Sequence, residues 1–363
     1  MILHFYFARK FFWTFLGISA VFLILLALID LDDELQDFPD LPFADVLTIV
    51  LLNVPHANYE IVPLVVILAA VALFLRLARS SELVVVRAAG RSALRSLMAP
   101  VTVAALIGFF SITVFNPIVA ASSKRYNDVV NNHLGGGTSV FAIASEGLWL
   151  RQGSPEGQTV IHAVRASSDV STLFGATYIS FLRDGQPNQR ITAEIALLAE
   201  GQWELSNAKV WDLSQGINSE AAAQLKPSLT IPSALTQDRI IDSFGKPEYI
   251  SLWDLPRFIN QLEVAGFSAR RYSVWYQMEL SRPLFLMALV MMAAAFTMRH
   301  ARLNNTGMSV LIAVMLGFTL HYIRNFAQIL GENGQIPIYL AAWAPPIASF
   351  MLATGILLHM EDG

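Results

Sequence analysis

The chain has 363 residues, of which 55% are hydrophobic and 14% are charged, and its formal net charge is −4. Because a soluble domain carries about 25% charged residues, this composition is typical of an integral membrane protein. The sequence contains no cysteine, which excludes disulfides, thiolate metal sites and cysteine nucleophiles. It also contains no Walker lysine motif, HExxH or GxSxG sequence, so an enzyme is disfavoured and we expect no cofactor.

The chain begins with a predicted membrane span. Phe11–Ile29 is a run of 19 uncharged residues, just long enough to cross about 30 Å of hydrocarbon. The run is longer than the ~7–15 residues of a signal-peptide core, so we interpret it as a retained span. Arg9 and Lys10 precede it, which predicts a cytoplasmic amino terminus. The following stretch, Asp30–Asp40, holds six acids and no base, and we predict that it forms an outer loop.

A basic segment separates the next two predicted spans. We predict a short interfacial helix and then the second and third spans at residues 43–53, 57–77 and 97–119. Between these spans, residues 76–95 contain five arginines and one acid, Glu82, which predicts a cytoplasmic turn. Ser80 and Glu82 can begin a helix and Gly90 can end it. We therefore expect a compact cytoplasmic helix over residues 80–91.

The middle of the chain changes character and predicts a β domain. Long apolar runs give way to short alternating segments bounded by turn residues, namely Gly147–Arg151, Thr159–Arg165, Ala176–Arg183, Arg190–Leu198 and Trp203–Trp211. This spacing favours an antiparallel sandwich or jelly roll, which the count of spans places outside the cytoplasm. We expect Ile161, Ile179 and Phe181 to point inward, lining either an apolar trough for a lipid or a closed core.

Three further spans complete the predicted architecture. The fourth predicted span is residues 283–298, lengthened at its start by residues 272–282. Spans at 303–323 and 336–360 follow. The predicted fold is a helical membrane protein with six transmembrane helices and an inserted all-β, jellyroll-like domain. We expect three domains, at 1–123, 124–270 and 271–363, with both termini in the cytoplasm.

Four sequence segments carry a resemblance to one family. They are SELVVVRAAGRS at 81–92, FYFARKFFWTFLG from residue 5, NVPHANYEIVPL at 53–64 and EGLWLRQG at 146–153. Together they resemble the LptF/LptG permeases of the lipopolysaccharide exporter over nearly the whole chain, and the combination favours the LptG branch. The resemblance implies a Gram-negative inner-membrane subunit, paired with an LptF-like paralogue on an LptB-like ATPase dimer. It also implies that the β domain passes lipopolysaccharide to an LptC/LptA-like periplasmic bridge.

The resemblance assigns a coupling role to the basic turn. It implies that Glu82 is the acid that docks into the ATPase, and Arg87, Ala88 and Gly90 match the same motif. Two simpler interpretations stay open. Glu82 and Arg79 can form an exposed pair worth ~0.2–0.5 kcal/mol, and the arginines can serve only to fix topology.

Candidate lipid contacts are basic residues near the outer membrane boundary. Some family members carry lysines just after the first span, but here that position is acidic. The candidates for phosphate contacts are instead Lys124, Arg125, Arg271, Arg282 and Arg324. Arg282 either faces a cavity or pairs with Glu279 at the interface.

Two other functions remain as alternatives. A permease of the lipoprotein-release kind typically has four spans, against the six counted here. A membrane-anchored β scaffold or assembly factor would have no use for an ATPase-coupling helix.

Overall fold

The structure is a computed structural model that describes residues 2–80, 82, 93–133, 142–144, 147–154, 157–167, 171–199, 201–214, 220, 223–233, 235–236, 240, 246–264, 266–298 and 306–362. The chain divides into two compact units. The helical unit comprises Met1–Val129, Glu248–Trp253 and Arg270–Gly363, and the β unit comprises Val130–Pro247 and Asp254–Ala269.

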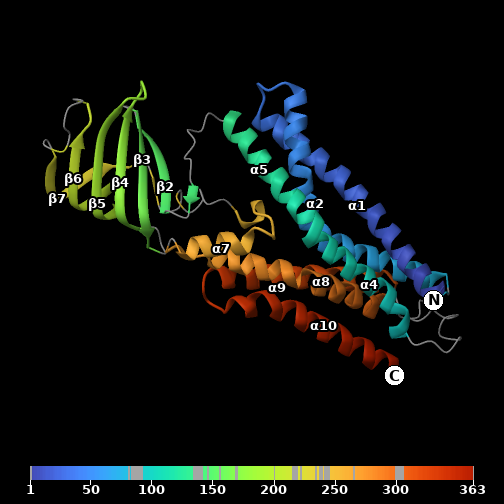
Figure 1. The fold of residues 1–363 in the computed structure, drawn as a ribbon. Coiled ribbons are helices and arrows are strands. Elements are labelled where there is room, and N and C mark those ends of the chain that lie inside the picture. The colour runs from blue at the N-terminus through green and yellow to red at the C-terminus, as the bar shows by residue number, and fades with distance from the viewer. Residues whose placement is uncertain are drawn as a thin grey trace. The chain divides into compact units, whose positions relative to one another are not determined.

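Among the described residues, six helices are long and apolar enough to cross a membrane. Together with the antiparallel sheet in the middle of the chain, they confirm the predicted fold class. The helices of the helical unit are α1 (Ile2–Asp37), α2 (Phe43–Arg79), α4 (Ala93–Phe110), α5 (Asn116–His133), α8 (Arg270–Thr297), α9 (Thr306–Glu332) and α10 (Ile338–Asp362). The short helices are η2 (Pro247–Tyr249) and α7 (Leu255–Val264). Figure 1 shows the long helices with the N-terminal ones in blue and the C-terminal ones in red.

Two local predictions about the first spans are wrong. The expected interfacial helix and the second span form one helix of 37 residues, α2, with Pro55 and Pro63 inside it. Prolines are tolerated in membrane helices because neighbouring groups satisfy the backbone that they leave free. Residues 30–37 of the expected outer loop are also helical, because α1 continues to Asp37.

Helix α8 is the centre of the helical unit. It contacts α2, α4, α9 and α10. In its most apolar stretch 78% of the residues are buried, whereas in the corresponding stretch of α1 only 6% are. The contact with α4 is close enough to require glycine in one place. A Cβ added at Gly108 of α4 would lie 2.5 Å from the backbone Cα of Pro283 of α8.

The third span changes its helical geometry halfway. Between α4 and α5, residues Ser111–Phe115 form one turn of π-helix, labelled η1. At this turn the carbonyl of Thr113 accepts a hydrogen bond from Nε1 of Trp253 at 3.3 Å. Just beyond it, Oδ1 of Asn116 accepts one from the backbone N–H of Leu252 at 2.8 Å. The segment 248–253 is thereby attached to the third span.

The β unit contains a seven-stranded antiparallel sheet whose strands lie in chain order (Figure 1). The strands are β1 (Ala142–Ala144), β2 (Gly147–Ser154), β3 (Gly157–Ala166), β4 (Thr172–Leu182), β5 (Pro187–Ala199), β6 (Gln202–Asp212) and β7 (Gln224–Pro232). The five predicted strands correspond to β2–β6. Strand β7 was missed because Pro227 interrupts its pattern, and proline is confined to edge strands such as this one.

One face of the sheet is buried and the other is partly open. The buried row runs across five strands through Leu150, Ile161, Tyr178, Ile191 and Val210, each at most 8% exposed. Because side chains alternate along a strand, the residues next to these in each strand point to the opposite face of the sheet.

Candidate functional site

Glu82 follows the C-terminal end of α2, where Arg76 and Arg79 lie. This end of the helical unit is here called the basic end. Nζ of Lys10 donates to both carboxylate oxygens of Glu82, at 2.9 and 3.1 Å. The hydroxyl of Ser80 donates to Oε1 at 2.9 Å. The structure therefore gives Glu82 a partner from α1, 72 residues earlier, rather than the neighbouring Arg79 that the sequence suggested.

The Glu82 carboxylate is charged and accessible. Its side chain is 31% exposed and that of Lys10 is 19% exposed. Partial burial alone would raise the pKa of Glu82, but the hydrogen bonds from Lys10 and Ser80 outweigh burial and hold the pKa below its ordinary value. A partly exposed, ionised acid of this kind can exchange one basic partner for another.

The surroundings of this pair are basic and aromatic. Nζ of Lys10 lies 4.4 Å from the ring centroid of Tyr6. A hollow of about 350 Å³ is lined by Tyr6, Arg9, Lys10, Trp13, Thr14 and Arg76. The other predicted coupling residues, Arg87, Ala88 and Gly90, lie outside the described residues.

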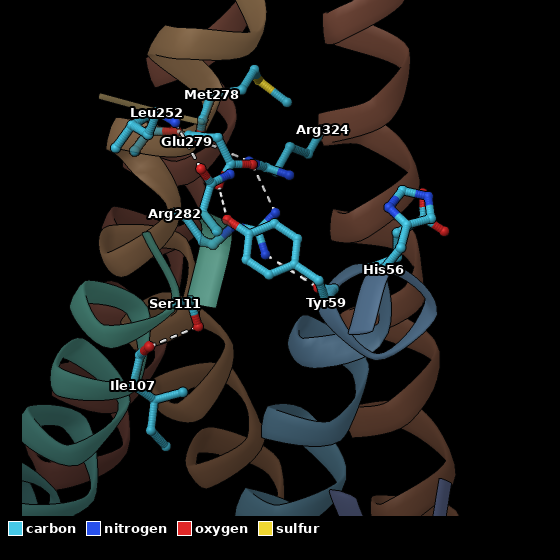
Figure 2. A network of polar contacts seen from close by, with 12 residues as sticks. His56, Tyr59, Ile107, Ser111, Leu252, Met278, Glu279, Arg282 and Arg324 are labelled. Carbon is cyan, nitrogen blue, oxygen red and sulfur yellow. Dashed lines mark hydrogen bonds and ion pairs between the residues drawn. The ribbon is translucent and has the colours of Figure 1, made fainter. Parts of the chain in front are cut away.

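The predicted pair of Glu279 and Arg282 forms, but it is buried in the bundle rather than lying at an interface (Figure 2). Nη2 of Arg282 donates to Oε1 of Glu279 at 2.7 Å, and their side chains are 5% and 1% exposed. The Tyr59 hydroxyl donates to the other carboxylate oxygen. The guanidinium of Arg282 lies 3.8 Å from the Tyr59 ring centroid and donates to the Tyr59 carbonyl at 3.2 Å. Sequence reasoning missed Tyr59.

Arg324 of α9 joins the same cluster. Its Nη2 donates to the carbonyl of Met278 at 2.9 Å, and its guanidinium lies 5.3 Å from the ring centroid of Phe285. The side chain is buried, at 6% exposed, and Nε has no hydrogen-bond partner among the described residues. The cluster thus connects α2, α8 and α9 through polar groups.

The five basic candidates do not share one environment. Arg282 and Arg324 lie together in the buried cluster (Figure 2). Lys124 and Arg125 are exposed on α5, and Arg271 is half-buried at the start of α8. The exposed residues are the ones that an external anion can reach without opening the bundle.

The acidic stretch at the far end of α1 is also tied to the bundle. Nδ2 of Asn53 donates to Asp30 at 2.8 Å, and the Tyr126 hydroxyl donates to Glu34 at 2.7 Å. These bonds join α1 to α2 and to α5. Part of the acidic charge therefore has a structural role, which the sequence did not reveal because each partner is distant along the chain.

The expectation for the β domain is partly wrong. Ile161 is fully buried, whereas Ile179 and Phe181 are only half-buried. Ile161 pairs with Tyr178 across β3 and β4, so Ile179 points to the opposite face. There it borders a hollow of about 360 Å³ lined by Trp149, Val160, His162, Thr177, Ile179 and Arg190.

Comparisons with known proteins agree with the resemblance in the sequence. The family model described as "Lipopolysaccharide export system permease LptF/LptG" matches residues 5–359. The chain is 22% identical over 315 residues to the lipopolysaccharide export system permease protein LptG of Escherichia coli K12, covering 85% of this chain and 84% of that protein. It is 23% identical over 319 residues to the protein of the same name from Haemophilus influenzae, covering 86% and 85%.

Proposed function

Since the chain belongs to the LptF/LptG family of lipopolysaccharide export permeases, we propose that it is the LptG-type subunit of an ATP-driven exporter. The family and the six apolar helices identify it as a multi-pass inner-membrane transporter subunit. In the proposed exporter, a separate LptB-like ATPase supplies energy and an LptF-like paralogue completes the permease. The β unit is periplasmic and passes lipopolysaccharide to an LptC/LptA-like bridge.

The observation that carries the ATPase coupling is the position and state of Glu82. It is an ionised, partly exposed carboxylate at the basic end, and the basic segment predicts that this end is cytoplasmic. When Glu82 docks into the ATPase, new hydrogen bonds replace or extend its contact with Lys10. The arginines of the motif, including Arg87, are proposed to flank this contact.

The continuous helix α2 offers a route from the coupling site into the membrane. Tyr59 lies 20 residues before Arg79 on this helix, which corresponds to about 30 Å at ~1.5 Å per residue. Tyr59 contacts Glu279 and Arg282 of α8. In this proposal, a displacement at the basic end passes along α2, which is continuous but contains Pro63 between Tyr59 and Arg79, to the centre of the bundle. We propose that this displacement changes the lipid cavity formed with the paralogue.

The proposed lipid contacts fall into two groups, one accessible and one buried. Lys124, Arg125 and Arg271 can meet lipid phosphates directly, because they lie at accessible or half-buried positions. Arg282 and Arg324 would reach a phosphate only after the bundle opens. The six spans also disfavour a four-span permease of the lipoprotein-release kind.

The test is Glu82→Ala, with Glu82→Asp and Arg79→Ala as comparison variants. Truncating a desolvated acid at a protein interface costs ~2–5 kcal/mol of binding free energy. The affinity for the ATPase should therefore fall by roughly 30-fold or more. Glu82→Asp should be intermediate, and Arg79→Ala nearly silent. The measurements are ATPase recovered per mole of permease and lipopolysaccharide release. Wild-type recovery and release from Glu82→Ala would contradict the coupling role.

A further inference from the structure

Three potential metal ligands converge outside the sites described above. His56 and Glu60 lie one turn apart on α2, and Glu248 comes from η2. Their ligand atoms all lie within 4.8 Å of one another. Nε2 of His56 is 3.7 Å from Oε1 of Glu60 and 3.9 Å from Oε2 of Glu248. Figure 2 shows the His56 ring apart from the ring of Tyr59.

These distances suit a shared cation better than direct hydrogen bonds. A hydrogen bond from a charged imidazole to a carboxylate is about 2.7–2.9 Å long, well below the distances at His56. Two ligands at about 2.0–2.2 Å from one tetrahedral metal lie roughly 3.3–3.6 Å apart. The observed separations need only a small inward movement to reach that value.

The tautomer of His56 decides how its ring meets the two carboxylates. Its other ring nitrogen, Nδ1, is buried without a hydrogen-bond partner among the described residues. If Nδ1 carries the proton of a neutral imidazole, the lone pair of Nε2 faces two carboxylates and is repelled by both. A cation between the three groups converts that repulsion into attraction.

The ligands are placed by elements that are already fixed. His56 and Glu60 share one face of α2, because residues four apart on a helix are neighbours. Glu248 begins the segment that Asn116 and Thr113 attach to the third span. The imidazole and the Glu248 side chain are 21% and 23% exposed, whereas Glu60 is 61% exposed. A metal could therefore enter from the Glu60 side.

We propose that His56, Glu60 and Glu248 form a binding site for a divalent transition-metal ion of the Zn²⁺ class. One imidazole with two carboxylates suits zinc better than magnesium or calcium, which prefer oxygen ligands alone. Three protein ligands leave one coordination position for water. The ion would join α2 to segment 248–253 and so brace the helical unit where the chain returns from the β unit.

The experiment measures zinc binding to the full chain, purified in detergent with its co-purifying partners and without a polyhistidine tag. After chelator treatment and its removal, Zn²⁺ is titrated by equilibrium dialysis and quantified by elemental mass spectrometry. We expect about one tight Zn²⁺ per chain and a zinc-dependent rise in unfolding temperature. His56→Gln and Glu248→Gln should each weaken binding at least tenfold, since even supporting residues of metal sites contribute 10–100-fold.

His133→Ala and Glu263→Gln are the controls, because both residues are exposed and lie outside the cluster. They should bind zinc as the wild type does. Equal zinc binding by the wild type and a His56→Gln/Glu248→Gln double variant would overturn the proposal. So would no tight zinc binding by the wild type. Neither result depends on ATPase coupling or lipid release, so this test is separate from that of the proposed function.

Discussion

Two ion pairs among the described residues of the helical unit lie in contrasting environments. Lys10 and Glu82 meet at the basic end, with side chains 19% and 31% exposed. Glu279 and Arg282 meet inside the bundle, with exposures of 1% and 5%. The hydrogen bonds are similar in length, at 2.9 and 2.7 Å. Chemistry and distance alone therefore do not distinguish the two pairs.

Burial determines what each pair can do. The Lys10–Glu82 pair is partly exposed, so water competes for both groups and the pair contributes ~0–1 kcal/mol. It can therefore be exchanged for another contact at little cost, as docking to a partner requires. A buried pair cannot separate without leaving a charge in an apolar interior. The buried pair thus holds helices together, and the exposed pair is available for recognition.

The largest expected effect comes from breaking the buried pair. Glu279→Ala leaves Arg282 without its carboxylate and should destabilise the helical unit by ~3–5 kcal/mol. The double variant Glu279→Leu/Arg282→Met removes both charges and should recover most of that loss. Thermal unfolding of the detergent-solubilised chain provides the measurement. Equal instability of the single and double variants would show that packing, rather than the unpaired charge, determines the cost.

An intermediate effect is expected from the packing around α8, which carries the buried pair. Gly108→Ala would place a Cβ 2.5 Å from the backbone of Pro283, and overpacking of this kind costs ~1–3 kcal/mol. Gly355→Ala is a matched control, because nothing lies within 4 Å of its added Cβ. Both variants are measured by thermal unfolding. If Gly108→Ala is as stable as Gly355→Ala, α4 can move away from α8 to accommodate the added Cβ, and the close contact is not required for stability.

The smallest effect is the pH dependence of the exposed pair. The pKa of Glu82 is lowered in the folded chain, so its contribution is complete above the unfolded value of about 4.3. The contribution is lost as the pH falls through the lower folded value. A cycle of Lys10→Met, Glu82→Gln and the double variant should show a coupling of at most ~1 kcal/mol at pH 7. A coupling that stays constant down to pH 3 would contradict this assignment.

Sequence patterns predicted the features that depend on neighbouring residues. Apolar length and loop charge identified the six spans, and alternation identified strands β2–β6. The continuity of α2 was missed because proline usually ends a helix in water, whereas this helix packs among apolar neighbours. The contact between Lys10 and Glu82 was missed because these residues are 72 positions apart.

The sheet shows why a pattern alone cannot place a side chain. Ile161 and Ile179 are equally apolar, and each lies in an alternating strand. The register pairs Ile161 with Tyr178, and a shift of one residue would exchange the two faces. The candidate lipid-facing residues therefore depended on a pairing that strand periodicity does not specify.

The π-helical turn at Ser111–Phe115 behaves as a one-residue insertion in the third span. In a regular α-helix at ~100° per residue, Gly108 and Asn116 would point about 80° apart. One extra residue in the turn reduces that angle to about 20°, so both residues keep the same side of the helix. Deleting one residue of the turn, such as Thr113, should restore an ordinary helix in which Gly108 and Asn116 are seven residues apart, again about 20°. Lys124 and Arg125 should then keep their direction relative to Gly108. The π turn thus absorbs one extra residue without changing the direction in which the exposed cations of this span point.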